Sequence, residues 1–282
     1  MLDALAAIME AFLFAGLLSC TGAVFAEATL GGSTDTTRFA ARVIRRGALL
    51  TIVASLAGAV ILVLRLGGQF DQVTLSAVFL SIHGAAFALQ VGGALLLLAT
   101  VAEDHFARSL RVANGSIVIL SFAYHGHAWN VGTGAAILAV GHIAAAAWWI
   151  GSLWLLHRAC SGEGPQELAA MVRRFGALAG RAVGGLLAAG LILALLIVSS
   201  AVTPFTSPYL RLLALKIGVV ACTLGAAAYN KYRLSPRLAR CDAAAAVSLR
   251  TMIRIELILI GAVLVTTAFL TTVTTPFRDF EF

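Results

Sequence analysis

The sequence predicts an all-α membrane protein, a polytopic bundle of about eight transmembrane helices, and two observations carry this prediction. Of the 282 residues, 60% are hydrophobic and only 12% are charged, and the mean hydropathy is +0.96. A water-soluble domain of this size does not place such a composition on its surface. The apolar residues also form continuous runs of helical length, without the short alternating segments that are typical of a β-barrel.

Eight apolar runs are each close to the ~20 residues that a helix needs to cross a bilayer. The fourth is the shortest and contains Tyr124, His125 and His127. The third and fifth are long enough to tilt or to extend beyond the bilayer. No internal repeat is evident, so we expect one membrane domain over residues 1–282. The runs occupy residues 4–28, 47–66, 73–101, 113–128, 133–156, 182–203, 209–230 and 253–275.

The first run has two possible interpretations. Leu17-Leu18-Ser19 precedes Cys20, as at the end of a lipoprotein signal. A signal peptide begins with a basic segment, however, and no Lys or Arg occurs before Arg38. We therefore expect a first membrane helix, with a cleaved signal as the alternative.

The basic residues predict how these helices are oriented. Of the 20 Lys and Arg residues, 16 lie in or beside the gaps that follow the odd-numbered runs. Cytoplasmic loops carry such an excess, so we expect both termini outside the cytoplasm. The net charge of +7 is therefore a sign of topology and not of nucleic-acid binding. On the outer side five acidic residues outnumber three basic ones, which favours cations there.

Ionisable side chains inside spanning helices mark candidate functional positions, because each costs on the order of 3 kcal/mol to insert. His83 lies about ten positions from the outer end of the third run and His142 about nine from that of the fifth, so we expect a shared depth. His125 and His127 end the fourth run on the same side. Residues i and i+2 of a helix point about 200° apart, so this pair converges on one ion only if the helix ends or loosens at Gly126.

Two further charged residues enter the outer half. Glu10 of the first run and Lys216 of the seventh lie at comparable depth and would complete or tune a site. Imidazole and carboxylate ligands suit Cu(II), whereas Cu(I) favours thiolate or thioether ligands, of which the outer half offers only Met9. A structural hydrogen bond to a neighbouring main chain is the alternative for each histidine. His105 and His157 lie at cytoplasmic helix ends and need no ligand role.

Near the inner face, Glu256 lies two residues after Arg254, and Lys231 follows the seventh run. Ion pairs between the last two helices are the expected role of these residues, with a release site for a transported ion as the alternative. The sequence contains no Walker-type loop, nucleophile elbow or paired catalytic carboxylates. We therefore expect a protein that is not an enzyme.

Six separated stretches of the sequence form a recognisable set. They are Gly126-His127-Ala128; His142 with Trp148-Trp149-Ile150-Gly151; Arg174-Phe175-Gly176; Lys216-Ile217-Gly218; Tyr229-Asn230-Lys231 with Ser235-Pro236-Arg237-Leu238; and Ile255-Glu256-Leu257. In order and spacing, from about residue 114 to 276, this set resembles the copper resistance D (CopD) family of bacterial inner-membrane proteins. The residues before it agree only in general character. Ser152 stands where the family has a second Gly, and Lys231 where it often has Arg.

The resemblance implies a multi-pass protein of the bacterial inner membrane with periplasmic termini. It implies copper import from periplasm to cytoplasm, sometimes with a periplasmic CopC-like copper-binding partner. His127 and His142 carry over from the family as copper ligands, and Lys216 and Glu256 as functional or structural polar positions. Candidates from depth alone are His83, His125 and Glu10. We expect a copper transporter with a histidine site in its outer half, and the ligand types of this site favour Cu(II).

Two other functions stay open. His83 and His142 at equal depth would serve as axial ligands on opposite sides of a haem in a membrane electron carrier. The other is a copper-binding anchor or sensor that signals through a partner and transports nothing. A haem absorption band that is lost on His142→Ala would favour the first, and absence of copper flux into vesicles would favour the second.

Overall fold

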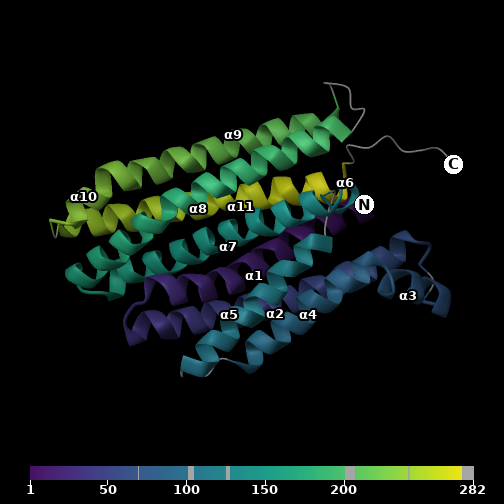
Figure 1. Cartoon of the computed structure of the whole chain (residues 1–282), viewed down its shortest axis with the longest axis horizontal. Helices are drawn as coiled ribbons and strands as arrows, with labels where there is room; N and C mark the ends of the chain where they lie inside the picture. The colour runs from purple at the N-terminus through teal and green to yellow at the C-terminus, as the bar shows by residue number, and fades with distance from the viewer. Residues whose placement is uncertain (69, 101–104, 125–127, 201–206, 241, 275–282) are drawn as a thin grey trace.

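The computed structural model describes residues 1–68, 70–100, 105–124, 128–200, 207–240 and 242–274, and over these residues it is helical, without a strand. Seven helices of this part are long and apolar enough to cross a membrane, and they run side by side along the molecule (Figure 1). The prediction of a polytopic helical membrane protein is therefore confirmed. The seven are α1 (Leu2–Leu30), α2 (Thr34–Arg65), α4 (Ile82–Ala99), α7 (Thr133–Gly162), α8 (Pro165–Ser200), α9 (Pro208–Tyr229) with its continuation through η2 (Asn230–Leu234) and α10 (Ser235–Leu238), and α11 (Ala243–Thr272).

The fourth predicted run is not among the seven. It forms α5 (His105–Leu120), which is only 16 residues long, and the 3₁₀ helix η1 (Ser121–Tyr124). A four-residue helix, α6 (Ala128–Val131), follows. α5 packs against α1 and α4 within the bundle. The eight expected helices therefore correspond, in the described residues, to seven long helices and one shorter one.

The third predicted run is two helices and not one. α3 (Gln72–Phe79) ends before Ser81, whose hydroxyl accepts a hydrogen bond from the backbone N–H of His83 and so caps α4. A Cβ added to Gly84 would lie 2.0 Å from the carbonyl oxygen of Phe79, so only glycine permits this turn. The long third helix was a wrong prediction. His83 consequently lies in the first turn of α4 and is exposed, not ten residues inside a span.

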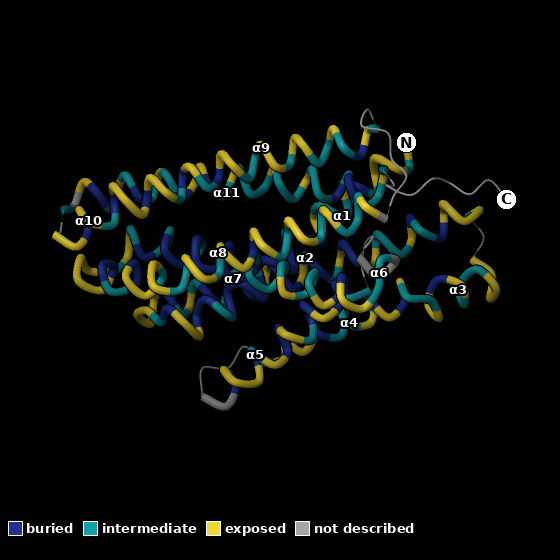
Figure 2. The backbone as a smooth tube through the Cα atoms, turned by 45° about the horizontal axis from the view of Figure 1, so that its top comes forward, coloured by how far each residue is buried: buried dark blue, intermediate teal, exposed yellow. Residues whose placement is uncertain are grey.

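α1 lies in the middle of the bundle and packs against α2, α7 and α11. It touches α7 backbone to backbone: a Cβ added to Gly22 would lie 2.0 Å from the carbonyl oxygen of Ala147, and one added to Gly151 would lie 1.9 Å from that of Gly22. Small residues allow such close approach of membrane helices. Figure 2 shows many more buried residues along α7 than along α9.

Polar contacts tie the helices together at both ends of the bundle. At the end that holds the start of α1, Arg65 forms an ion pair with Asp3 and donates to the carbonyl oxygen of Thr272. We call this the outer end and the opposite one the inner end. The basic residues expected on the cytoplasmic side make their contacts at the inner end, namely Arg158 with Asp35, Arg111 with Glu27 and Arg174 with the carbonyl oxygen of Leu30.

Candidate functional site

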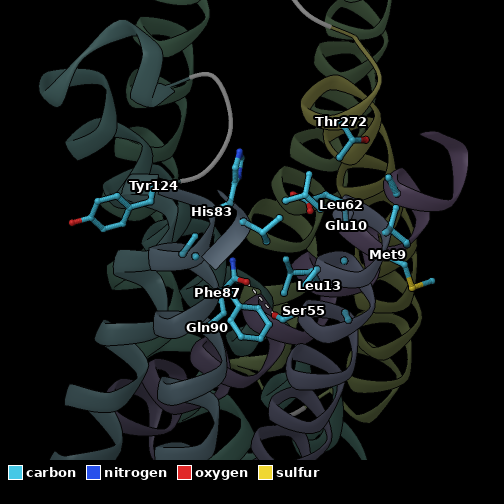
Figure 3. A pocket seen from close by; sticks show the side chains of 18 of the residues that line it. Met9, Glu10, Leu13, Ser55, Leu62, His83, Phe87, Gln90, Tyr124 and Thr272 are labelled. Carbon is cyan, nitrogen blue, oxygen red and sulfur yellow. Dashed lines mark hydrogen bonds between the residues drawn. The ribbon is translucent and has the colours of Figure 1, made fainter. Parts of the chain in front are cut away.

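A cavity of about 450 Å³ lies at the outer end between α1, α2 and α4 (Figure 3). Glu10 of α1 and His83 of α4 both line it, as does Met9. Deeper in the bundle, the Ser55 hydroxyl donates a 3.1 Å hydrogen bond to the Gln90 side-chain oxygen, and both residues are buried. Two of the predicted ligand residues, one from each of two separate helices, therefore face one space, and we call it the outer cavity.

The folding of two helices places these groups. The Ser81 cap begins α4 immediately before His83, which puts the imidazole at the mouth of the outer cavity. Glu10 lies in the third turn of α1 and is partly buried. Arg65 also lines the cavity, and Asp3 and the end of α11 hold its guanidinium. The site therefore combines a carboxylate and an imidazole with a thioether nearby.

His125 and His127 lie outside the described residues, so their ligand roles stay predictions. The residues on either side of them do line the outer cavity: Tyr124 ends η1 and Trp129 belongs to α6. The two aromatic rings lie 5.3 Å apart. The α-helix of this run ends at Leu120 and a 3₁₀ turn follows to Tyr124, whereas the condition for convergence of the two histidines concerned Gly126, which the structure does not describe.

His142 occupies a different place, at the contact of α7 with α8. Its Nδ1 lies 2.9 Å from the carbonyl oxygen of Leu186. A carbonyl can only accept, so Nδ1 carries the proton and a neutral ring keeps a lone pair on Nε2. Gly190 makes room for the ring, because a Cβ there would lie 2.8 Å from the His142 Cε1. Lys216 of α9 lies close enough for its charge to act on this imidazole.

The structure therefore does not bring His83 and His142 together. His83 faces the outer cavity, which His142 does not line, and His142 contacts α8. Two axial ligands of one haem would flank a common space, so this arrangement does not support the electron-carrier alternative. Within the residues described, no three or more His, Cys, Asp or Glu side chains are grouped so as to hold a metal ion. Of the predicted ligands that the structure describes, Glu10 and His83 therefore share the outer cavity and His142 does not line it.

A second polar cluster lies in the inner half of the bundle, around Glu256 of α11. This side chain is only 2% exposed and accepts a hydrogen bond from the amide of Asn230, with a further one from Trp149. Ion pairs between the last two helices were expected here, but Lys231 lies over the Tyr232 ring and Arg254 donates to Nε2 of His157 at 3.1 Å. The predicted ion pair of Glu256 is therefore wrong, since its partners are neutral. Sequence reasoning placed Asn230 and Trp149 in family-like stretches, but it gave Asn230 no role and assigned Trp149 only to packing and anchoring.

Comparison with known proteins identifies one family. Residues 169–270 match the family model described as Copper resistance protein D. No curated protein and no solved structure matches the chain. The matched part begins in α8 and ends in α11, so it includes Lys216 and Glu256, whereas His127 and His142 precede it. The resemblance is confirmed for this part, and the copper ligands carried over from the family stay predictions.

Proposed function

We propose that this chain, whose residues 169–270 match the model of the copper resistance protein D family, is a bacterial inner-membrane transporter that takes up copper through the outer cavity. The family match supports a copper-resistance membrane protein. The observation that supports the finer proposal is that Glu10 and His83 line one cavity at the end of the bundle opposite the basic clusters. Copper is the cargo of this site and not a resident cofactor.

The chemistry of the outer cavity favours Cu(II). Imidazole nitrogen and carboxylate oxygen are suitable ligands for this borderline ion. Met9 adds a thioether, which is the softer donor that Cu(I) prefers. His125 and His127 are our further ligand candidates on the basis of the sequence. His142, with its lone pair on Nε2, is a candidate for a separate ligand position at the α7–α8 contact.

The distribution of charge supports an orientation with the outer cavity in the periplasm. Arg158, Arg111 and Arg174 make their contacts at the inner end, and such residues remain on the cytoplasmic side. Both chain termini are then periplasmic, and a CopC-like protein would deliver copper from that side. A periplasm-active reporter fused to the C-terminus should be active, and an inactive one would overturn this orientation.

Removal of the two ligands tests the proposal. We expect a Glu10→Gln, His83→Ala double variant to lose copper affinity by about tenfold or more, as when metal-site partners are removed. Metal content of the detergent-purified protein and copper flux into reconstituted vesicles are the measurements. His157→Gln, at the inner end, is the matched control. A double variant that binds and moves copper like the parent would exclude the outer cavity, whereas binding without flux in the parent would favour an anchor or sensor.

A further inference from the structure

A carboxyl group with only neutral partners lies inside the bundle, away from the outer cavity. Glu256 is 2% exposed and lies about 20 Å along α11 from the inner end of that helix. The Asn230 amide and the Trp149 side chain hydrogen-bond it, and neither carries a charge. The outer cavity does not include any of these three residues.

The charged groups on the described helices around Glu256 do not act on it. Arg254 is bound to His157, and the charge of Arg250 acts on His157 and Cys160. In the part of the chain that the structure describes, no cation forms an ion pair with Glu256. Of the other charged groups on the elements packed against α11, Arg158 pairs with Asp35, Arg237 with Asp242 and Glu27 with Arg111, and Lys231 lies over the Tyr232 ring. Lys216 of α9 acts on His142, and neither it nor Arg211 and Arg233 of the same continuous helix acts on Glu256.

A carboxylate that is removed from water without a neighbouring cation is unfavourable, and such a group commonly takes up a proton. The neutral acid needs one acceptor for its O–H, whereas the carboxylate needs donors. A side chain that can both donate and accept a hydrogen bond therefore stabilises the charged and the neutral form of the carboxyl group. An amide side chain is such a partner, because its NH₂ donates and its carbonyl oxygen accepts.

Asn230 meets this requirement. It is 8% exposed, its NH₂ donates to Glu256, and its own side-chain oxygen has no hydrogen-bond partner although it is buried. Rotation of the amide by half a turn would present that oxygen to a protonated Glu256. Asn230 also begins the π-helical turn η2, where the Ser235 hydroxyl donates to its carbonyl oxygen at 3.0 Å. Such turns often occur at functional sites.

We propose that Glu256 is a proton-binding site of the membrane bundle. The carboxylate takes a proton from water that reaches it from the inner end and returns it by the same route, while the Asn230 amide donates to the charged form and accepts from the neutral one. No bond other than O–H forms or breaks. If the proposed copper transport holds, uptake would depend on this proton, but the site itself is independent of copper.

Infrared spectroscopy of the full-length protein in detergent tests the site. We expect a carbonyl stretching band of a protonated carboxyl group that disappears between about pH 5 and about pH 9, the range in which buried glutamates titrate. Glu256→Gln should abolish the band, and Glu167→Gln, an exposed carboxyl at the start of α8, should retain it. Asn230→Leu should move the titration by about one pH unit to higher pH, because the carboxylate loses a donor.

Two results would overturn the proposal. One is the absence of any band that Glu256→Gln removes, which would mean a permanently ionised carboxylate. The other is a band that persists unchanged over the whole pH range, which would mean a fixed structural acid. Copper content measured on the same Glu256→Gln sample separates this site from the outer cavity, since we expect copper binding there to be retained.

Discussion

At the scale of single residues, the chemistry of a buried carboxyl group in this bundle is set by its nearest neighbour. Glu27 of α1 lies 3.4 Å from the Arg111 guanidinium, and each side chain is 6% exposed. Glu256 is also buried, but it has amide and indole partners. The first arrangement is a buried ion pair that holds α5 against α1, whereas the second leaves a group free to exchange a proton.

The Glu27–Arg111 pair yields a prediction about stability. Removal of one partner leaves a buried charge, so Glu27→Gln should destabilise the protein by about 3–5 kcal/mol. The Glu27→Gln, Arg111→Met double variant should recover part of this loss, because neither charge remains. Thermal unfolding in detergent measures the stability of the single and the double variant. Asp35→Asn, which removes an exposed ion pair with Arg158, is the control and should change stability by about 0–1 kcal/mol. Equal effects of the buried and exposed variants would contradict this interpretation.

At the scale of the elements, the close approach of α1 and α7 positions the outer cavity and the α7–α8 contact relative to each other. Gly22 and Gly151 form the crossing, and any side chain there would overlap the opposite backbone. Gly151 belongs to the stretch that resembles the family. The Trp148 ring beside it donates a 2.9 Å hydrogen bond to the Thr29 hydroxyl and stacks on Phe175, which extends the contact from α1 to α8.

We predict that Gly151→Ala lowers the stability of the bundle, because the helices must separate to admit a methyl group. Such overpacking typically costs about 1–3 kcal/mol. Gly218→Ala is the matched control, since nothing lies within 4 Å of a Cβ added there, and it should be neutral or stabilise by up to about 1 kcal/mol. Thermal unfolding of the two variants in one detergent distinguishes them, and similar melting temperatures would refute the close crossing.

In the connection between α7 and α8, Glu163 makes a contribution to stability that depends on pH. Glu163 accepts hydrogen bonds from the Ser33 N–H at 3.1 Å, from the Ser33 hydroxyl at 2.6 Å and from Thr36, at the start of α2. Partial burial raises the pKa of the Glu163 carboxyl, but these hydrogen bonds and the Arg158 charge outweigh it, so the pKa lies below the ordinary value of 4.5. A carboxyl group with a lowered pKa stabilises the fold at pH values above its ordinary pKa. This contribution is lost as the pH falls from 4.5 through the lower pKa of the folded state.

The expected outcome concerns the stability difference between the parent and Glu163→Gln. This difference should be constant above pH 4.5 and should shrink as the pH falls further, because the parent carboxylate is then protonated. Unfolding curves recorded at a series of pH values provide the measurement. A difference that grows at acid pH would contradict the assigned hydrogen bonds.

At the scale of the whole molecule, the apolar runs were sufficient to predict the helical membrane bundle, because lipid permits little else for a chain of this hydropathy. The break between α3 and α4 was not predicted, since one serine in an apolar run is a weak signal, although Ser81 is a good helix cap. The charged residues were located by their cost in lipid, and two of them, Glu10 and His83, do share a cavity.

The direction in which a helix presents each side chain could not be predicted from spacing. His142 faces α8 because Gly190 leaves space for its ring, a contact between helices far apart in the sequence. Likewise, Glu256 contacts the amide of Asn230 at the start of η2, whereas the sequence predicted ion pairs between the last two helices. Depth and residue type follow from the sequence, but helix rotation depends on packing.

Electron paramagnetic resonance of the protein loaded with one equivalent of Cu(II) is the most direct test of the outer cavity as the copper site. We predict nitrogen couplings from a bound imidazole that weaken or vanish in His83→Ala and remain in His157→Gln. A spectrum that is identical in the parent and in His83→Ala would contradict the assignment of copper to Glu10 and His83.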